Sequence, residues 1–208
     1  MVRRYVHLGT GNYNPTTALV YTDLGLFTAN EDMVADASAL FNLLTGYSQG
    51  HRWRKFIVAP GDLHRRTIEL IEGQAERARR GLGARIFAKL NSLVDYRVIE
   101  ALYRASQAGV PIELVVRSIC CLRPGLPGIS ENIRVRSIVD RFLEHSRIFV
   151  FNPDEEAVVY LGSADWMPRN FYRRVEVMFP LEAPELKARV LNEIVPAYLR
   201  DNVKCRLL

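Results

Sequence analysis

The stretch that decides the fold reads Arg141-Phe-Leu-Glu-His-Ser-Arg-Ile-Phe-Val-Phe151 and, after a turn, Val158-Val-Tyr-Leu-Gly-Ser-Ala-Asp-Trp166. Its two apolar runs, rich in β-branched and aromatic residues, predict two strands that begin at Arg147 and Val158. Side chains alternate along a strand, so His145 and Arg147 are expected on the same face. The Gly-Ser turn adds hydrogen-bond donors beside them. The segment therefore predicts a histidine and an arginine presented together at a strand end.

The order of these residues resembles a known half-motif. His145-x-Arg147, a strand, a turn, a strand and then Gly162-Ser-x-Asp165 is similar to the His-x-Lys and Gly-Ser-x-Asn pattern of phospholipase D-like enzymes. One half-motif is weak by itself. A second histidine module around His7 fits a fold that works by pairing two half-sites.

His7 lies in a strand-like run and is followed by Gly9-Thr-Gly-Asn-Tyr-Asn14. Two glycines let the backbone approach a ligand closely, and successive N–H groups in such a turn form a concave anion site. A nucleophilic histidine beside the amide side chains of Asn12 and Asn14 indicates phosphate transfer. The alternative from the residues alone is a tight hairpin with a hydrogen-bonded strand histidine.

The other two histidines, His51 and His64, stand among arginines and are expected on the surface without a chemical role. Arg117 ends a predicted strand, and ligands of open α/β sheets gather beyond the carboxyl ends of strands. Arg117 is therefore a candidate phosphate clamp, with a surface arginine paired to a carboxylate as the alternative. More arginines stand where loops are expected to begin, namely Arg123, Arg134 and Arg136.

Strands and helices alternate along the chain, which predicts an α/β fold with a mixed or parallel sheet covered by helices. A polar, turn-rich stretch at 46–54 divides a first unit, 1–50, from a second unit, 51–208. A unit of about 50 residues can rarely bury a sufficient core alone, so the first unit either packs onto the second or is part of something larger. Strands are expected over 4–8, 18–22, 24–28, 56–59, 86–90, 112–117, 147–151, 158–162 and 175–179. Helices are expected over 32–44, 63–80, 95–108, 138–144 and 184–199.

The composition is that of a globular protein with a basic surface. The 208 residues are 49% hydrophobic and 25% charged, with a net charge of +5 and an isoelectric point near 9.3. The charge fits either a solvated basic surface or an anionic ligand such as a nucleotide, a nucleic acid or polyphosphate. No apolar run approaches the ~18 residues of a membrane span, and no secretory signal is evident. Three cysteines in this spacing predict neither a disulfide framework nor a zinc site, which favours the cytoplasm.

Several long strings resemble the C-terminal half of bacterial polyphosphate kinase, the long-chain polymerising type. They are HLGTGNYNPTTALVYTDLGLFTA at 7–29, LNSLVD at 90–95, the segment at 109–151 and YLGSADWMPRN at 160–170. The resemblance covers essentially the whole chain. It implies a phospholipase D-like mixed sheet flanked by helices, with one complete domain at 51–208 and an incomplete preceding one at 1–50. It also implies a kinase that transfers the terminal phosphate of ATP reversibly onto polyphosphate, with Mg²⁺.

The resemblance assigns roles to individual residues. The phosphorylated histidine of the family falls on His7, its second active-site histidine on His145 and its nucleotide-contacting arginine on Arg117. Phe41 is the nearest candidate for an aromatic that stacks on adenine. ATP binding is thus expected at Phe41, Arg117 and His145, and phosphate binding at Asn12, Asn14, Arg134, Arg136 and Arg147.

In the family, several hundred residues precede the first histidine motif, and they carry residues associated with Mg²⁺ and some nucleotide contacts. The Mg²⁺ ligands are therefore expected outside this chain. The expected partners are ATP or ADP and polyphosphate, and either a second copy or the preceding domains. Nucleic acid is not expected, because aromatics are not interleaved with the basic residues.

Two alternatives stay open beside the kinase. One is a truncated, inactive fragment that binds polyphosphate. The other, less favoured, is a phospholipase D-like phosphodiesterase, because neither histidine has a lysine two positions on: Gly9 follows His7, and Arg147 follows His145.

Overall fold

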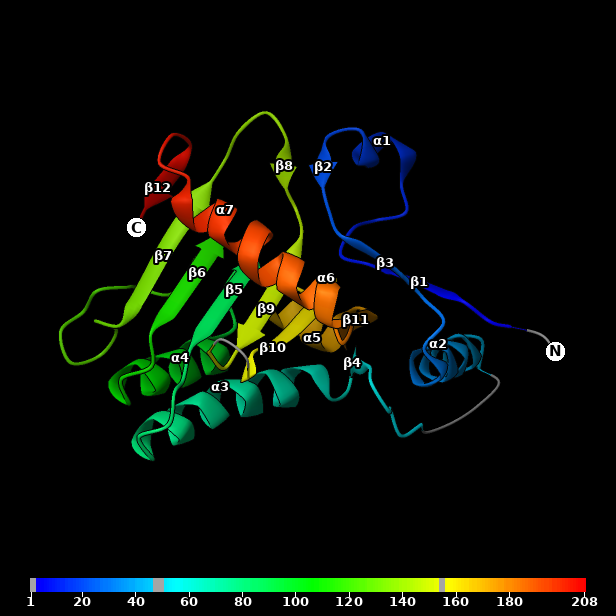
Figure 1. Ribbon diagram of the computed structural model, residues 1–208, viewed down its shortest axis with the longest axis horizontal. Coiled ribbons are helices and arrows are strands. Elements are labelled where there is room, and N and C mark those ends of the chain that lie inside the picture. Colours follow the sequence, from blue (N-terminus) through cyan, green and yellow to red (C-terminus); the bar gives the residue numbers. More distant parts are fainter. Residues whose placement is uncertain (1–2, 47–50, 154–155) are drawn as a thin grey trace.

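An eight-stranded mixed sheet forms the centre of the chain in the computed structural model, which describes residues 3–46, 51–153 and 156–208 (Figure 1). The strand order is β12-β7-β6-β5-β9-β10-β11-β4. Strands β5, β6 and β7 run parallel to one another, and β5 pairs with β9 in the antiparallel sense. The strands are β4 Ile57–Ala59, β5 Ile86–Leu90, β6 Ile112–Val116, β7 Ile133–Ile138, β9 Arg147–Phe151, β10 Val158–Gly162, β11 Glu176–Pro180 and β12 Cys205–Leu207.

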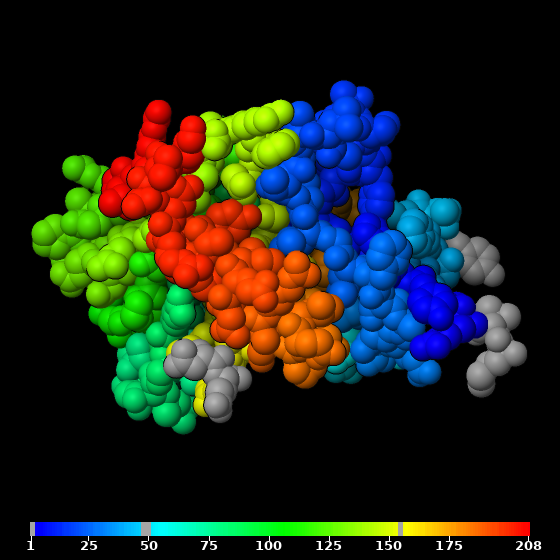
Figure 2. All heavy atoms as spheres, turned by 45° about the horizontal axis from the view of Figure 1, so that its top comes forward, coloured from blue at the N-terminus to red at the C-terminus, as the bar shows by residue number. Residues whose placement is uncertain are grey.

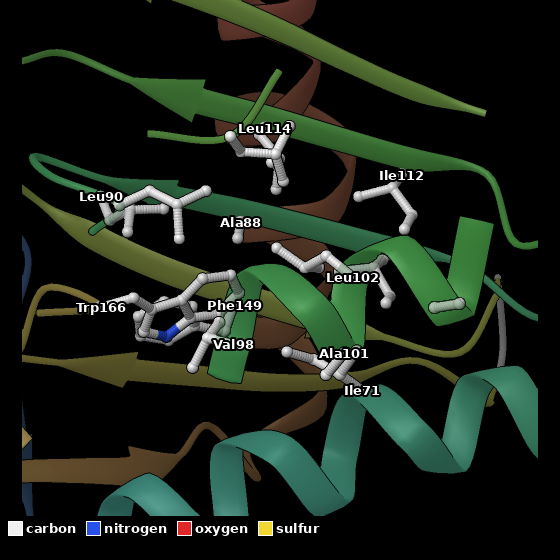
Figure 3. Packing of buried hydrophobic residues seen from close by; sticks show 14 of the residues in the cluster. Ile71, Ala88, Leu90, Val98, Ala101, Leu102, Ile112, Leu114, Phe149 and Trp166 are labelled. Carbon is white, nitrogen blue, oxygen red and sulfur yellow. The ribbon is translucent and has the colours of Figure 1, made fainter. Parts of the chain in front are cut away.

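Helices α3 (Leu63–Arg79) and α4 (Tyr96–Gln107) cover one face of this sheet (Figure 1). The apolar residues of α4 recur at helical spacing and pack on alternate residues of β5, as the close view of this core shows (Figure 3). Asp95 begins α4, because its side chain accepts hydrogen bonds from the N–H groups of Arg97 and Val98. A short helix, α5 (Pro168–Arg173), follows β10.

The other face of the sheet packs against the C-terminal helical segment and the first unit. The C-terminal segment consists of α6 Pro184–Arg189, a π-helical turn Val190–Ile194 and α7 Val195–Arg200. Phe87, which alternates with the residues that face α4, contributes to this second core together with Val150 and Val195. Residues with opposite orientation in the same strand therefore fill two separate apolar layers.

The first unit contains two short strand pairings and two helices. β1 (Val6–Gly9) pairs in the antiparallel sense with β3 (Gly25–Thr28), and β2 (Tyr21–Thr22) pairs in parallel with β8 (Leu143–Glu144) of the second unit. α1 spans Pro15–Ala18 and α2 spans Glu31–Leu44. In Figure 2 the blue surface of this unit borders the surface of the second unit. Leu8 and Met33 also belong to the second apolar core, so the first unit packs onto the second.

A buried carboxylate reinforces that packing. Asp36 of α2 is fully buried and accepts hydrogen bonds from the backbone N–H groups of Arg54, Lys55 and Phe56. Burial by itself would raise the pKa of Asp36, but the N–H groups of Phe56, Lys55 and Arg54 hold this pKa below its ordinary value. Asp36 therefore ties α2 to the segment that leads into β4.

The predicted α/β class, a mixed sheet flanked by helices, is confirmed, and strands 86–90, 147–151 and 158–162 coincide with β5, β9 and β10. The predicted helix at 138–144 is wrong: β7 continues to Ile138, and Leu143 then donates its N–H to the carbonyl of Val20 as β8 pairs with β2. The predicted strand at 18–22 is only partly correct, because α1 extends to Ala18. In the predicted linker at 46–54, residues 47–50 lie outside the described residues. No helix within the described residues is long and apolar enough to span a membrane.

Candidate active site

One edge of the sheet gathers the candidate residues of the second unit. β5 and β6 are parallel and β9 is antiparallel to β5, so the carboxyl ends of β5 and β6 lie at the edge where β9 begins. Asn91 follows β5, Arg117 follows β6, and His145 and Arg147 stand at the start of β9. The Nε of Arg117 donates to the amide oxygen of Asn91 at 3.0 Å. The mixed topology thus brings together residues that are far apart in the sequence.

Arg147 is buried and forms the centre of this edge. Its Nε and Nη2 donate to the two carboxylate oxygens of Asp165 at 3.2 and 3.3 Å. Its Nη1 donates to the carbonyl oxygens of His145 at 2.9 Å and Thr10 at 3.1 Å. Asp165 also accepts from the backbone N–H of Asn91 at 2.8 Å. A buried guanidinium needs such partners, and here they link β9, β5 and the first unit.

His145 is also buried, with 8% of its surface exposed. Its Nδ1 lies 2.9 and 3.1 Å from the two carboxylate oxygens of Asp23, a residue of the first unit. The hydroxyl of Thr10 donates to the same carboxylate at 2.7 Å. The ring of Tyr21 lies 4.6 Å from the imidazole, centre to centre. Asp23 and Tyr21 could not be predicted as site residues, because no local pattern signals contacts across more than a hundred residues.

Lys89 of β5 holds the chain on both sides of His145. Its Nζ donates to the carbonyl and hydroxyl oxygens of Ser146 at 3.1 and 3.0 Å, and it lies 3.4 Å from a carboxylate oxygen of Glu144. The ring of Tyr198 lies 4.8 Å from the ammonium. Burial lowers the pKa of Lys89 to about 8, although Glu144 acts in the opposite direction.

A cavity of about 380 Å³ opens at this edge. Its lining includes His145, Asn12, Tyr21 and Asn91. Among the described residues, the lining also holds four arginines and two carboxylates: Arg117, Arg147, Arg169, Arg174, Asp165 and Glu176. The excess of arginine suits an anionic ligand with several oxygens. Arg169 and Arg174 were not singled out from the sequence, although both stand just after the Gly-Ser motif.

His7 opens onto a second cavity of about 320 Å³. The Nδ1 of His7 is hydrogen-bonded to the hydroxyl of Tyr13 at 2.5 Å, and the ring of Phe27 lies 4.4 Å away. A Cβ at Gly25 would approach Nε2 of His7 to 2.8 Å, with the two neighbouring ring carbons at 3.7 and 3.9 Å, so it would stand end-on in front of this nitrogen. The missing side chain at Gly25 thus leaves space in front of Nε2. Asn12 and Tyr21 line both cavities, so the cavity of His7 adjoins the arginine-lined cavity.

Some predicted site residues lie elsewhere. Asn14 caps α1, because its side-chain oxygen accepts from the N–H groups of Thr16 and Thr17. Phe41 is 68% exposed on α2. The guanidinium groups of Arg134 and Arg136 lie beside the carboxylate of Glu113. The linings of the two cavities do not include any of these four residues, and their assigned roles stay predictions.

His51 lies on the surface, as expected, whereas His64 does not. The Nε2 of His64 lies 3.0 Å from a carboxylate oxygen of Asp95, and its Nδ1 lies 2.9 Å from the hydroxyl of Tyr172. It is buried because it stands on the stripe of α3 that packs inward, together with Thr67 and Ile71. His64 therefore ties the start of α3 to α4 and α5.

The residues near the cavities do not fit a metal site. Within the described residues, no group of three or more His, Cys, Asp and Glu side chains is placed to hold a metal ion. The carboxylates at the site already have partners: Asp23 binds Thr10 and His145, and Asp165 binds Arg147.

The fold defines the class of protein. The structure is similar to the crystal structure of a phospholipase D family member, Nuc from Salmonella typhimurium, with a TM-score of 0.52 and 14% identity over 74% of this chain and 96% of that one. The chain therefore has a phospholipase D-like fold.

The family is more specific. Residues 1–50 match the family described as Polyphosphate kinase C-terminal domain 1, and residues 56–208 match Polyphosphate kinase C-terminal domain 2. The chain belongs to the polyphosphate kinase family. It is 54% identical to a polyphosphate kinase of Thermosynechococcus vestitus over 97% of this chain and 27% of the relative. The crystal structure of polyphosphate kinase from Porphyromonas gingivalis superposes with a TM-score of 0.93 at 43% identity, covering 98% of this chain and 31% of that one. The chain thus spans less than a third of the length of these relatives.

Proposed function

We propose that this chain takes part in the reversible transfer of the terminal phosphoryl group of ATP to polyphosphate, with His7 as the residue that carries the phosphoryl group. The observation that supports the proposal best is the junction of the two cavities. The imidazole of His7 opens onto one cavity, and four arginines and His145 line the next. A nucleophile beside a cationic site is the arrangement that phosphoryl transfer requires.

Tyr13 prepares His7 for attack. Its hydroxyl also lies 3.4 Å from the carbonyl oxygen of His7, to which it donates its proton. The phenol oxygen then accepts the Nδ1–H of His7, which leaves the lone pair of the imidazole on Nε2. Neutral imidazole is a competent nucleophile near neutral pH. Nε2 is therefore the atom on which the phosphoryl group is received.

The transfer takes place in two balanced steps. Nε2 of His7 attacks the terminal phosphorus of ATP, the new N–P bond forms, and the bond from phosphorus to the bridging oxygen breaks as ADP leaves with the electron pair. A terminal oxygen of polyphosphate then attacks the same phosphorus, and the N–P bond breaks. The chain of phosphates is longer by one unit and His7 is restored. The reverse sequence makes ATP.

The arginine-lined cavity stabilises the charge. Negative charge spreads over the oxygens of the transferring group, so positioned cations lower the barrier. Arg117, just after β6, and His145, just before β9, both line the cavity, where the imidazole can exchange a proton with a phosphate oxygen. Arg147 is already bonded to Asp165, so its main effect is to hold His145 in place. Mg²⁺ would add further positive charge, with ligands expected outside this chain.

Labelling tests the proposal directly. Incubation of the chain with ATP labelled in the terminal phosphate and Mg²⁺ is expected to give an acid-labile, base-stable phosphoramidate on His7. His7→Gln should remove the label, whereas His51→Gln, an exposed histidine in the same part of the chain, should retain it. Undiminished label in His7→Gln would overturn the assignment of His7.

The second candidate function is binding of polyphosphate without turnover. It is favoured by one observation: the arginines of the arginine-lined cavity all come from the second unit. That cavity can therefore hold an anion whether or not His7 reacts. Salt-dependent binding of polyphosphate with no label on His7 would favour it. Cleavage of a phosphodiester by the chain would instead favour a phospholipase D-like hydrolase.

A further inference from the structure

We infer that Asp23 is a positioning residue for His145: it holds the imidazole in the tautomer that carries its proton on Nδ1, so that Nε2 is the nitrogen presented for reaction. The tautomer follows from the geometry alone. The claim that this tautomer serves phosphoryl transfer rests on the proposed function.

A carboxylate is acceptor-only, so a contact with a ring nitrogen requires that this nitrogen carry a proton. The Nδ1 of His145 lies 2.9 Å from Oδ2 of Asp23 and 3.1 Å from Oδ1. Nδ1–H therefore donates to Asp23. The guanidinium of Arg147 is also nearby, with Nη1 3.0 Å from Nε2 and 3.1 Å from Nδ1. The two protons of Nη1 go to the carbonyl oxygens of His145 and Thr10, so this contact leaves the hydrogen bond from Nδ1–H to Asp23 as the one that sets the tautomer.

Thr10 fixes the orientation of the Asp23 carboxylate. The hydroxyl of Thr10 accepts a hydrogen bond from the backbone N–H of Leu24 at 3.0 Å and donates its own proton to Oδ1 of Asp23 at 2.7 Å. Thr10 is only 1% exposed, so its proton has no access to bulk water. Oδ1 is thereby assigned to Thr10, and Oδ2 is the oxygen nearest to His145.

The glycine-rich turn makes this arrangement possible. A Cβ on Gly11 would collide with the carboxylate of Asp23. The same turn also accepts a hydrogen bond from Arg147 through the carbonyl of Thr10. The Gly-Thr-Gly segment beside His7 therefore builds the contact that orients the histidine of the other unit, and the two half-sites are coupled through Asp23.

An isosteric substitution distinguishes orientation from simple packing. In Asp23→Asn the side-chain oxygen must take the place of Oδ1, because the reverse orientation would leave the buried proton of Thr10 without an acceptor. That loss costs about 1–3 kcal/mol. The amide NH₂ then faces Nδ1 of His145 and donates to it. The imidazole must switch its proton to Nε2, while the shape of the site hardly changes.

The experiment measures the tautomer of His145 in the 208-residue chain by two-bond ¹H–¹⁵N correlation of the imidazoles, with His145→Gln used for assignment. The spectra are recorded over a range of pH, and the tautomer is read where the imidazole signals no longer change as the pH rises, because the ring is neutral there. The unsubstituted chain is expected to show the Nδ1–H pattern and Asp23→Asn the Nε2–H pattern. Asp32→Asn, an exposed carboxylate of the same unit paired with Arg54, is the matched control and should retain the Nδ1–H pattern. Unchanged signals from the other imidazoles show that Asp23→Asn is folded.

The activity measurement separates this inference from the proposed function. If the chain transfers phosphate, Asp23→Asn should lower kcat by about 10²- to 10⁴-fold with a small change in KM, because the wrong nitrogen then carries the proton. A switched tautomer in a chain that never labels His7 would count against the proposed function and leave the orienting contact intact. An Nδ1–H pattern that persists in folded Asp23→Asn would overturn the inference.

Discussion

The two histidines of the candidate site are supported in different ways. His145 stands at the start of a central strand and is 8% exposed. Asp23 and Arg147 contact it directly, and Lys89 holds the next residue, Ser146. His7 stands in a two-stranded ribbon, and its ring contacts come from exposed aromatics, Tyr13 at 79% and Phe27 at 80% exposure. The core of the protein positions His145, whereas a local turn positions His7.

The difference extends to the surfaces of the two units. Large apolar side chains gather on the outside of the first unit: Tyr5, Tyr13, Leu19, Phe27, Phe41 and Leu44 are all at least half exposed. In the second unit the strands β5 and β9 are buried along their whole length. A substitution near His145 should therefore change the stability of the whole protein, and one near His7 should change chemistry with little effect on stability.

The largest effect is expected from Arg147→Met. The substitution leaves the buried carboxylate of Asp165 with one backbone donor in place of a paired guanidinium, and it removes the bond to Thr10. Loss of one partner of a buried ion pair costs about 3–5 kcal/mol. Urea unfolding should show this loss, and Arg134→Met, whose side chain is 76% exposed, should change stability by less than about 1 kcal/mol. Equal stabilities of the two variants would show that Arg147 contributes no more to stability than an exposed arginine does.

A slightly smaller effect is expected from Leu102→Ala. Leu102 is fully buried between α4 and the sheet (Figure 3). Its truncation should destabilise the chain by about 2–5 kcal/mol, because transfer free energy is lost and a cavity remains. Leu19→Ala in the first unit, where the side chain is 78% exposed, should change stability by no more than about 0.5 kcal/mol. If Leu19→Ala lowered the urea midpoint as much as Leu102→Ala does, Leu19 would be shielded from solvent by the first unit.

The free energy of unfolding should also depend on pH, because Lys89 is buried beside His145. Burial lowers the pKa of Lys89 to about 8, below its ordinary value of 10.5. Between these two values the unfolded chain binds the proton and the folded chain does not, so this group makes stability increase as pH rises from about 8 to 10.5. In Lys89→Met that rise should be reduced, whereas Lys204→Met, an exposed lysine paired with Asp140, should retain it. A pH–stability profile unchanged by Lys89→Met would show that Lys89 keeps its ordinary pKa.

How much the sequence could predict also differs between local and tertiary features. The strands β9 and β10 and the placement of His145 beside Arg147 follow from alternation within a few residues. The contact of Asp23 with His145 joins positions 122 apart, so no spacing rule could find it. The segment at 138–144 shows the opposite error, because pairing of β8 with β2 overrides its local preference.

Two features were present in the sequence and were missed. Ile133 and Val135 alternate with Arg134 and Arg136, which is the period-two pattern of the strand β7. His64 stands at helical spacing from buried residues of α3, which indicates a buried position in spite of its arginine neighbours. In both cases the neighbouring arginines obscure the periodicity of the apolar residues.

The smallest effect on stability, and the sharpest test of the comparison, is expected from Tyr13→Phe. The hydroxyl that is lost binds only Nδ1 and, at 3.4 Å, the carbonyl oxygen of His7, and the side chain is 79% exposed. The free energy of unfolding should change by less than about 1 kcal/mol. The rate of His7 labelling should nevertheless fall several-fold, because either ring nitrogen of the freed imidazole can then carry the proton. Tyr5→Phe, at an exposed tyrosine of the same unit, should leave both quantities unchanged. A labelling rate that Tyr13→Phe does not alter would show that the ribbon itself, and not the tyrosine, sets the reactive nitrogen of His7.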